Sequence, residues 1–179
     1  MFNLPIDLRP VLDATGGCVD VDTDVHFDAL VVGEERFDAV APAHVTATVS
    51  NVGSGFAAMG TVTAPVRATC ARCLCEFETV LEGELEGLYL LPGQEADEAE
   101  MAEKVSSDGF IDLGGAIGAA LTIAAPFVPL HDEQCAGLCP GCGADLNAEE
   151  CSCGEQVDEA HPFAGLASLL ESEDDSEQS

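Results

Sequence analysis

Residues 76–91, EFETVLEGELEGLYLL, form a long extended run in this 179-residue chain and decide its fold class. Apolar side chains recur along the whole run: Phe77, Leu81, Leu85 and Leu88. Gly83 and Gly87 lie inside it, and a glycine within a strand indicates a bulge or strong bending. We therefore predict one long, bent strand that belongs to a larger sheet.

Three shorter runs before it also have the pattern of strands. Residues 18–27 place apolar residues on one parity and acidic residues or histidine on the other, which is the period of a half-buried strand. Cys18, at the start of this run, is expected to be buried. Residues 44–49 alternate in the same way, and residues 56–68 resume the pattern after a glycine turn. This spacing predicts an antiparallel sheet curled into a barrel-like domain.

A helix is expected after a polar, acidic loop at residues 92–109. Asp112 is placed to accept hydrogen bonds from the first N–H groups of this helix. The helix should end at Ala125, because the residue before a proline avoids the α region. The fold class is therefore α+β: a mainly antiparallel, barrel-like sheet, one or two packed helices and a C-terminal zinc-knuckle segment. Three apolar residues spaced four apart define the buried face of the helix: Leu113, Ile117 and Leu121.

Charge is the most unusual property of the chain. It holds 34 acidic and 5 basic residues, for a formal net charge of −29. Phosphate backbones and anionic membranes repel such a chain, so naked nucleic acid and membrane surfaces are poor direct partners. The acidity fits either a solvated surface shaped by the host proteome or a salty habitat, or a docking face for a basic protein. No catalytic residue and no small-molecule substrate is predicted.

The nine cysteines are expected to stay reduced. The first residues lack a basic start followed by an apolar block, so no signal peptide is predicted. Prolines interrupt the longest apolar stretch, residues 113–130, which is also too rich in Gly and Ala for a membrane span. We therefore expect a cytoplasmic protein, in which metal ligation is favoured over disulfide bonds.

Five cysteines fall between residues 135 and 153. The sequence Cys139-Pro-Gly-Cys142-Gly143 is typical of a zinc knuckle, in which a tight turn directs two thiolates at one ion. Cys151-Ser-Cys153 can close the site. Four thiolates leave no open position for water, so the predicted Zn²⁺ is structural, and folding of this core-poor segment should depend on it. The first predicted ligand set is Cys139, Cys142, Cys151 and Cys153.

A second ligand set satisfies tetrahedral coordination equally well, because Cys70-Ala-Arg-Cys73 forms another Cys-x-x-Cys pair. Two knuckles that meet across the fold would give Cys70 and Cys73 with Cys139 and Cys142. Cys135 is a possible further ligand, and two ions or none are the other outcomes. His131 lies four residues before Cys135, although a histidine in such a place is more often a surface residue.

Composition divides the chain into three predicted regions. Residues 1–130 should form the β-rich, barrel-like core with one helix. Residues 131–170 should form the cysteine-rich zinc segment and a terminal helix, whose apolar patch is at 163–170. Residues 171–179 are predicted to be a disordered acidic tail.

The order of several motifs is similar to that of a known family. The motifs are, along the chain, Cys70-Ala-Arg-Cys73-Leu74, Ile111-Asp-Leu113 with its helix and Pro126, Cys135 to Asn147, Cys151-Ser-Cys153, and His161-Pro-Phe to Leu169. This order resembles the YceD family of large ribosomal RNA subunit accumulation proteins. The resemblance implies a non-enzymatic role in the accumulation or processing of large-subunit ribosomal RNA, with a metal that stabilises the fold or a docking surface.

A ribosomal protein or a pre-ribosomal particle is therefore the expected partner, reached through protein contacts. A direct RNA-binding module is a competing hypothesis, which the acidity of the chain disfavours. The alternative from another class is a thiol redox or metal-handling protein, suggested by the number of cysteines.

Overall fold

The computed structural model describes residues 2–94, 102–151 and 153. The chain divides into two compact units, of which the first ends at Cys135 and the second begins at Ala136. The helix expected at 163–170 and the tail expected at 171–179 lie outside the described residues, so both stay predictions. So do the predicted domain limits.

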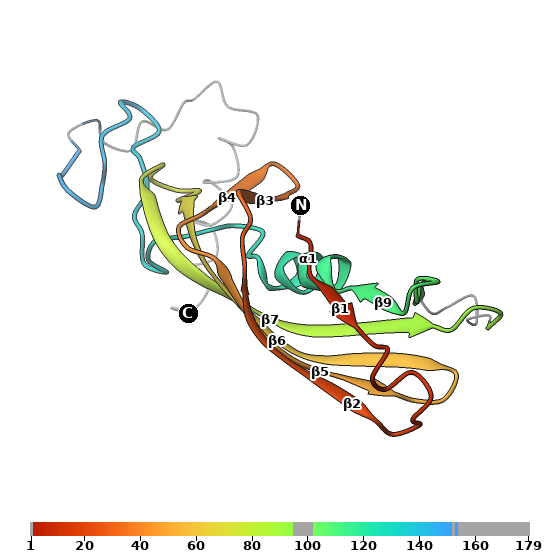
Figure 1. Cartoon of the computed structure of the whole chain (residues 1–179). Helices are drawn as coiled ribbons and strands as arrows, with labels where there is room; N and C mark the ends of the chain where they lie inside the picture. The colour runs from red at the N-terminus through yellow and green to blue at the C-terminus, as the bar shows by residue number, and fades with distance from the viewer. Residues whose placement is uncertain (1, 95–101, 152, 154–179) are drawn as a thin grey trace, which may run out of the picture. The chain divides into compact units, whose positions relative to one another are not determined.

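The first unit holds two sheets and one helix (Figure 1). The smaller sheet pairs two short strands near the N-terminus and before the helix, β1 (Pro5–Asp7) and β9 (Phe110–Asp112). The helix is α1 (Gly114–Ala124). The larger sheet has seven strands: β2 (Cys18–Val25), β3 (Ala29–Val32), β4 (Glu35–Ala39), β5 (Ala43–Asn51), β6 (Gly55–Thr69), β7 (Glu76–Leu90) and β8 (Ala102–Lys104).

A long hairpin of β6 and β7 forms the centre of the larger sheet. Each strand has 15 residues, and they pair without interruption from Gly55–Leu90 to Thr69–Glu76. The continuous register shows that the bulge expected at Gly83 or Gly87 is absent, while the hairpin as a whole does bend (Figure 1). Glycine is needed at position 83 because α1 approaches the strand closely there. A Cβ at this position would lie 2.6 Å from the carbonyl oxygen of Ala120 in α1. Only a glycine lets the helix approach the strand this closely.

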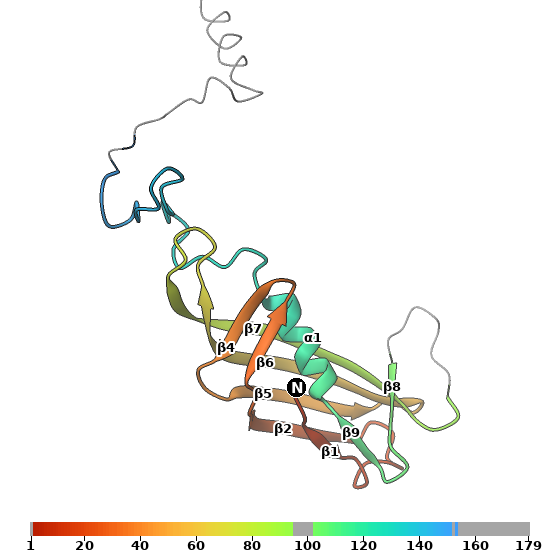
Figure 2. The ribbon, with the colours of Figure 1, turned by 90° about the horizontal axis from the view of Figure 1, so that it is seen from above.

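The larger sheet is open, so the predicted barrel is wrong. Its strands run in the order β2-β5-β6-β4-β3, with β7 on the other side of β6 and β8 beyond β7. The physical reason is α1, which lies across one face of the sheet and packs mainly on β7 (Figure 2). A sheet whose apolar face is covered by a helix has no need to close on itself to bury that face.

The helix follows the sequence prediction at both ends. Leu113 is the cap residue, and the Asp112 carboxylate accepts a hydrogen bond from the Gly114 N–H at 2.9 Å. The same carboxylate accepts the Leu4 N–H at 2.7 Å, which ties the N-terminal segment to the start of the helix. Ala125 has extended backbone angles before Pro126, so the helix ends where predicted.

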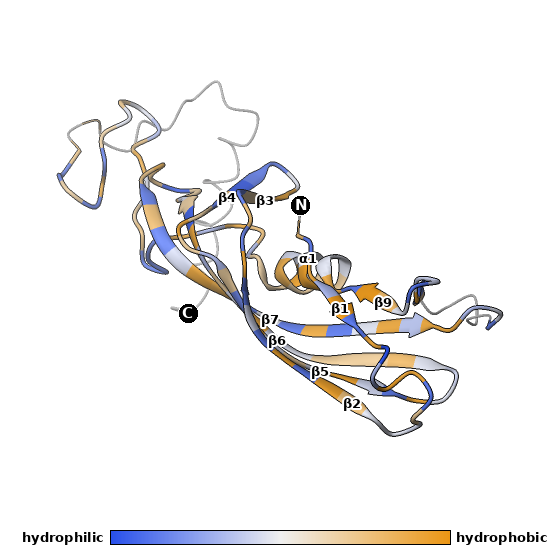
Figure 3. Cartoon of the chain, in the orientation of Figure 1, coloured by the Kyte–Doolittle hydropathy of each residue, from blue (hydrophilic) through white to orange (hydrophobic). Residues whose placement is uncertain are grey.

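Hydropathy alternates along the strands (Figure 3), and the burial of the side chains follows this alternation, which gives the sheet a buried and an exposed face. In β5, for example, Val45 and Val49 are buried, while His44 and Thr48 are exposed. The core joins these inward residues to the buried side of α1, and its last member along the described chain is Ala125. Among the described residues, none of the helical segments has the length and hydropathy that a transmembrane helix requires.

The second unit is built from turns rather than from strands. Its described part contains one isolated bridge, between Leu138 and Asp145. The Ala136 N–H donates to the Asn147 side-chain oxygen at 2.8 Å, which holds the two ends of this loop together. None of its described residues belongs to the hydrophobic core, so apolar burial contributes little to its order.

Candidate metal centre

The C-terminal cysteine cluster begins with a knuckle at Cys139–Gly143. The Gly143 N–H donates to the Cys139 carbonyl at 2.8 Å and closes the turn. Gly143 has a φ of 75°, in the left-handed region that favours glycine. This turn brings the Cys139 and Cys142 sulfurs to the same side of the loop as the later cysteines, as their grouping within 4.8 Å shows.

Four sulfurs converge in this cluster: those of Cys139, Cys142, Cys151 and Cys153. Cys151 Sγ lies 3.1 Å from Cys139 Sγ and 3.5 Å from Cys142 Sγ. A tetrahedral ion with bonds of about 2.3 Å to sulfur sets neighbouring sulfurs about 3.8 Å apart. The observed spacing is slightly tighter than this and needs only small side-chain shifts to fit one ion. The first ligand set predicted from the sequence is therefore brought together, although metal binding itself stays a prediction.

The backbone of this cluster favours thiolates at particular positions. The Gly141 N–H donates to Cys139 Sγ at 3.4 Å, and the Cys153 N–H donates to Cys151 Sγ at 3.2 Å. The hydrogen bond from the Cys151 thiol, with those from backbone N–H groups, lowers the pKa of Cys139 to about 6. Hydrogen bonds to Cys151 and Cys142 raise the pKa of Cys153 to about 12. Sulfurs this close resist sharing several negative charges, and a cation at their centre would relieve that repulsion.

The structure gathers Cys70 and Cys73 into a different group, with His131 and Cys135. The mixed set of Cys70 and Cys73 with Cys139 and Cys142 would join residues of the two units, and it stays a prediction. Sequence reasoning gave His131 little weight, and its four-residue spacing from Cys135 was the available signal. Cys18, expected to be buried, is exposed at the start of β2.

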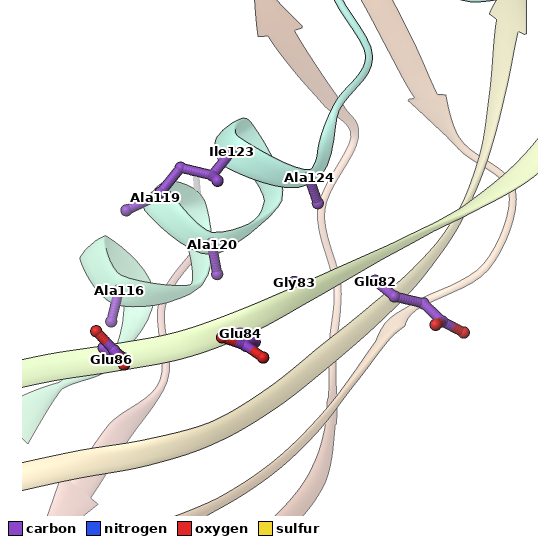
Figure 4. A pocket seen from close by; sticks show the side chains of 9 residues that line it. All are labelled: Glu82, Gly83, Glu84, Glu86, Ala116, Ala119, Ala120, Ile123 and Ala124. Carbon is purple, nitrogen blue, oxygen red and sulfur yellow. The ribbon is translucent and has the colours of Figure 1, made fainter.

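A groove of about 490 Å³ runs beside β7 and α1 (Figure 4). Glu82, Glu84 and Glu86 line it from the strand together with Gly83, and four alanines with Ile123 line it from the helix. No strand in the described part of the chain pairs with this edge of β7 before Leu88, where β8 begins its contact. The outward N–H and C=O groups of an unpaired strand edge are available for hydrogen bonds.

The three glutamates belong to a larger acidic face. Across the sheet, Glu82 pairs with Thr63, Thr63 with His44, and His44 with Asp24. The β2 edge of this face carries exposed aspartates, and the hydrogen bond that His44 Nδ1 donates to the Asp24 carboxylate at 2.9 Å raises the pKa of His44. Carboxylates thus line both margins of the exposed sheet face. The aspartates of the β2 margin are Asp20, Asp22 and Asp24.

Fold and site define a small protein with an open antiparallel sheet, one covering helix and two cysteine clusters that are geometrically suited to metal binding. The YceD family, described as large ribosomal RNA subunit accumulation protein, matches residues 58–170. The chain belongs to this family, as its sequence motifs indicated. Membership supports a role related to ribosome biogenesis.

The chain is also similar to curated mycobacterial proteins described as uncharacterized. Relatives from Mycobacterium tuberculosis and Mycobacterium bovis are 35% identical over 129 residues, which cover 71% of this chain and 61% of each relative. A Mycobacterium leprae relative is 32% identical over 133 residues, covering 73% of this chain and 60% of that protein. The chain thus spans about three fifths of the length of these relatives. No solved structure matches it at comparable significance.

Proposed function

We propose that this protein is a non-enzymatic, cytoplasmic factor that supports accumulation or processing of large-subunit ribosomal RNA during ribosome assembly. Family membership supports the process, and the charge of the chain supports the mode of action. A net charge of −29 favours contact with a basic protein over contact with RNA phosphates. The partner is a ribosomal protein, alone or on a pre-ribosomal particle.

The observation that carries this proposal is the acidic edge of β7. An extended segment of the partner adds to the open strand edge through backbone hydrogen bonds. Its alternate side chains then point to opposite faces of the sheet. Basic side chains on one face meet the row of Glu82, Glu84 and Glu86, and apolar side chains on the other face meet Ala119 and Ile123 of α1. Ile123 is 86% exposed, so its apolar surface is open to such a contact.

The metal has a supporting role in this proposal. A Zn²⁺ ion on Cys139, Cys142, Cys151 and Cys153 has four sulfur ligands and no open coordination position, so it stabilises the unit rather than binding a substrate. The donor set fits the metal, because sulfur ligands at these separations select zinc or another thiophilic ion over calcium or magnesium.

Charge reversal on one strand tests the docking edge. The triple variant Glu82→Lys/Glu84→Lys/Glu86→Lys should lose at least tenfold in affinity for protein extracted from large ribosomal subunits, measured by fluorescence titration. A control with the same change in charge is Asp20→Lys/Asp22→Lys/Asp24→Lys on β2, which should retain most of the affinity. Equal losses in both variants would show that only net charge matters and would overturn the edge as the binding site.

A deletion strain tests the biological role. Loss of the protein should lower the ratio of large-subunit to small-subunit ribosomal RNA, and the wild-type gene should restore it while the β7 variant does not. An unchanged ribosome profile in the deletion strain would overturn the proposed function.

A further inference from the structure

A second group of ligands lies in the first unit, at the turn that joins β6 to β7. Cys70 and Cys73 come from this turn and are buried, with exposed fractions of 0% and 8%. His131 and Cys135 come from the segment that follows α1. The three sulfurs and one ring nitrogen all lie within 4.8 Å of one another.

The distances in this group match tetrahedral coordination. Cys70 Sγ lies 3.9 Å from Cys135 Sγ, and Cys73 Sγ lies 3.4 Å from His131 Nδ1. Zinc bonds of about 2.3 Å to sulfur and 2.0–2.1 Å to nitrogen give edges of about 3.8 Å between two sulfurs and about 3.6 Å between sulfur and nitrogen. Both observed edges agree with these values to within about 0.2 Å, and the Cys70–Cys135 separation is far longer than a disulfide bond of about 2.05 Å.

The turn has the same backbone construction as the C-terminal knuckle. The Leu74 N–H donates to the Cys70 carbonyl at 2.9 Å, as the Gly143 N–H donates to Cys139. Leu74 also has a φ of 61°, which is rare for a residue other than glycine. Its side chain is 64% exposed, so packing of that side chain does not explain the strained conformation. The left-handed residue instead closes the turn through its N–H, at the same position as in the C-terminal knuckle.

Protein contacts hold the two halves of the site together. The Ala71 N–H donates to the Pro129 carbonyl at 2.8 Å. The Arg72 guanidinium donates to the carbonyls of Glu133 and Cys135 at 3.2 and 2.9 Å. The fold therefore presents a prearranged set of soft ligands.

We propose that Cys70, Cys73, His131 and Cys135 bind a second zinc ion, which fastens the segment after α1 to the turn between β6 and β7. The site is distinct from the C-terminal cluster and does not depend on the function proposed above. Cys75 stays outside the ligand set, because the group whose ligand atoms all lie within 4.8 Å of one another consists of Cys70, Cys73, His131 and Cys135 and does not include it.

Metal content of the full chain, purified under reducing conditions, tests the proposal. Elemental analysis should find two zinc ions per chain. Cys70→Ser/Cys135→Ser should reduce the content to one, and Cys139→Ser/Cys142→Ser should independently reduce it to one. Cys75→Ser and Cys18→Ser are matched controls that remove a neighbouring or an exposed thiol and should retain two ions.

The wild-type protein provides a measurement that does not depend on how the variants fold. X-ray absorption at the zinc edge should report seven sulfur and one nitrogen ligands over the two ions, from four cysteines at one site and three cysteines with His131 at the other. Coordination by sulfur alone, or one zinc ion that is insensitive to Cys70→Ser/Cys135→Ser, would overturn the second site. If only the C-terminal site failed to bind metal, the protein would hold one zinc ion, coordinated by sulfur and nitrogen ligands.

Discussion

The two cysteine clusters share one local design in two very different surroundings. Each starts with a Cys-x-x-Cys turn whose next residue is left-handed and donates its N–H to the first cysteine's carbonyl. The cluster at Cys70 adjoins a sheet and helix with an extensive core, whereas no described residue around Cys139 belongs to that core. The comparison teaches that the same turn can fasten a segment onto an existing fold or provide most of the order of its unit.

The two turns also differ in the residue that follows the second cysteine of each Cys-x-x-Cys pair. Gly143 adopts its left-handed angle without steric cost, while Leu74 adopts a similar angle with a Cβ. A strained residue persists only where its surroundings determine the backbone. The well-packed unit therefore tolerates a leucine at this position, and the core-poor unit has the residue that needs no such support.

Metal removal should have the largest effect and should separate the two units. With a strong chelator, amides of the second unit such as those of Cys139 and Leu146 should exchange hydrogen at the rate of an unfolded chain, because structural zinc contributes about 10 kcal/mol to core-poor modules. Amides of β5 and β6 should stay protected. Hydrogen exchange with mass spectrometry measures both, and zinc added back should restore protection. If amides around Cys139 stayed protected from exchange in the metal-free protein, the second unit would not depend on metal for its order, and the contrast between the two clusters would be wrong.

A substitution in the core should destabilise the first unit and leave the second unchanged, which is the opposite of the effect of metal removal. Leu121 lies on the buried side of α1 and is fully buried, and Leu121→Ala should lower the free energy of unfolding of the first unit by about 3 kcal/mol. Thermal or urea denaturation measures the loss. The exchange rates around Cys139 should not change in native buffer; a parallel increase there would show that the second unit relies on the core after all.

Gly83 and Gly118 offer a matched pair of glycine substitutions. Gly83→Ala should destabilise the first unit by about 2 kcal/mol, because its Cβ would meet the backbone of Ala120. Gly118→Ala, whose Cβ would meet only Phe2 at 3.7 Å, should stabilise α1 by up to about 0.8 kcal/mol. Urea denaturation should show changes of opposite sign. If Gly83→Ala proved neutral, the close approach of helix and strand would not limit this position.

The smallest expected effects come from the left-handed residues of the two turns. Gly143→Ala should cost about 1 kcal/mol, since nothing but its φ opposes a Cβ there, and should weaken zinc binding about fivefold in competition with a chelator. Leu74→Gly should stabilise its turn by about 0.5 kcal/mol, because relief of strain exceeds the entropy lost by glycine. A destabilised Leu74→Gly variant would mean that the leucine side chain contributes to stability despite its exposure.

Sequence patterns predicted the elements better than their arrangement. Alternation located β2, β5, β6 and β7, and the proline after Ala125 located the end of α1, because both signals are local. Closure of the sheet was predicted wrongly, because it depends on whether a distant segment covers the apolar face. Gly83 was interpreted as a bulge or a strong bend for the same reason: its contact, Ala120, lies 37 residues away along the chain.

The candidate site shows the same division. Spacing placed the set of Cys139, Cys142, Cys151 and Cys153 first, since these cysteines lie in one short stretch, but it left the set of Cys70 and Cys73 with Cys139 and Cys142 open. Cys70 and His131 are separated by the whole of β7 and α1, and the hydrogen bonds that bring them together involve backbone groups that carry no sequence signal. A sequence shows which cysteines and histidines are present, but it does not show which of them share a site when they lie this far apart along the chain.

The unpaired edge of β7 also affects whether copies of this protein associate with one another. Two molecules that tried to join along this margin would place one row of carboxylates directly opposite another, and like charges in that position oppose strand pairing. The same side chains that invite a cationic strand thus keep identical copies apart. Because salt screens exposed charges beyond about 10 Å at 0.1 M, self-association should increase, rather than decrease, as ionic strength rises.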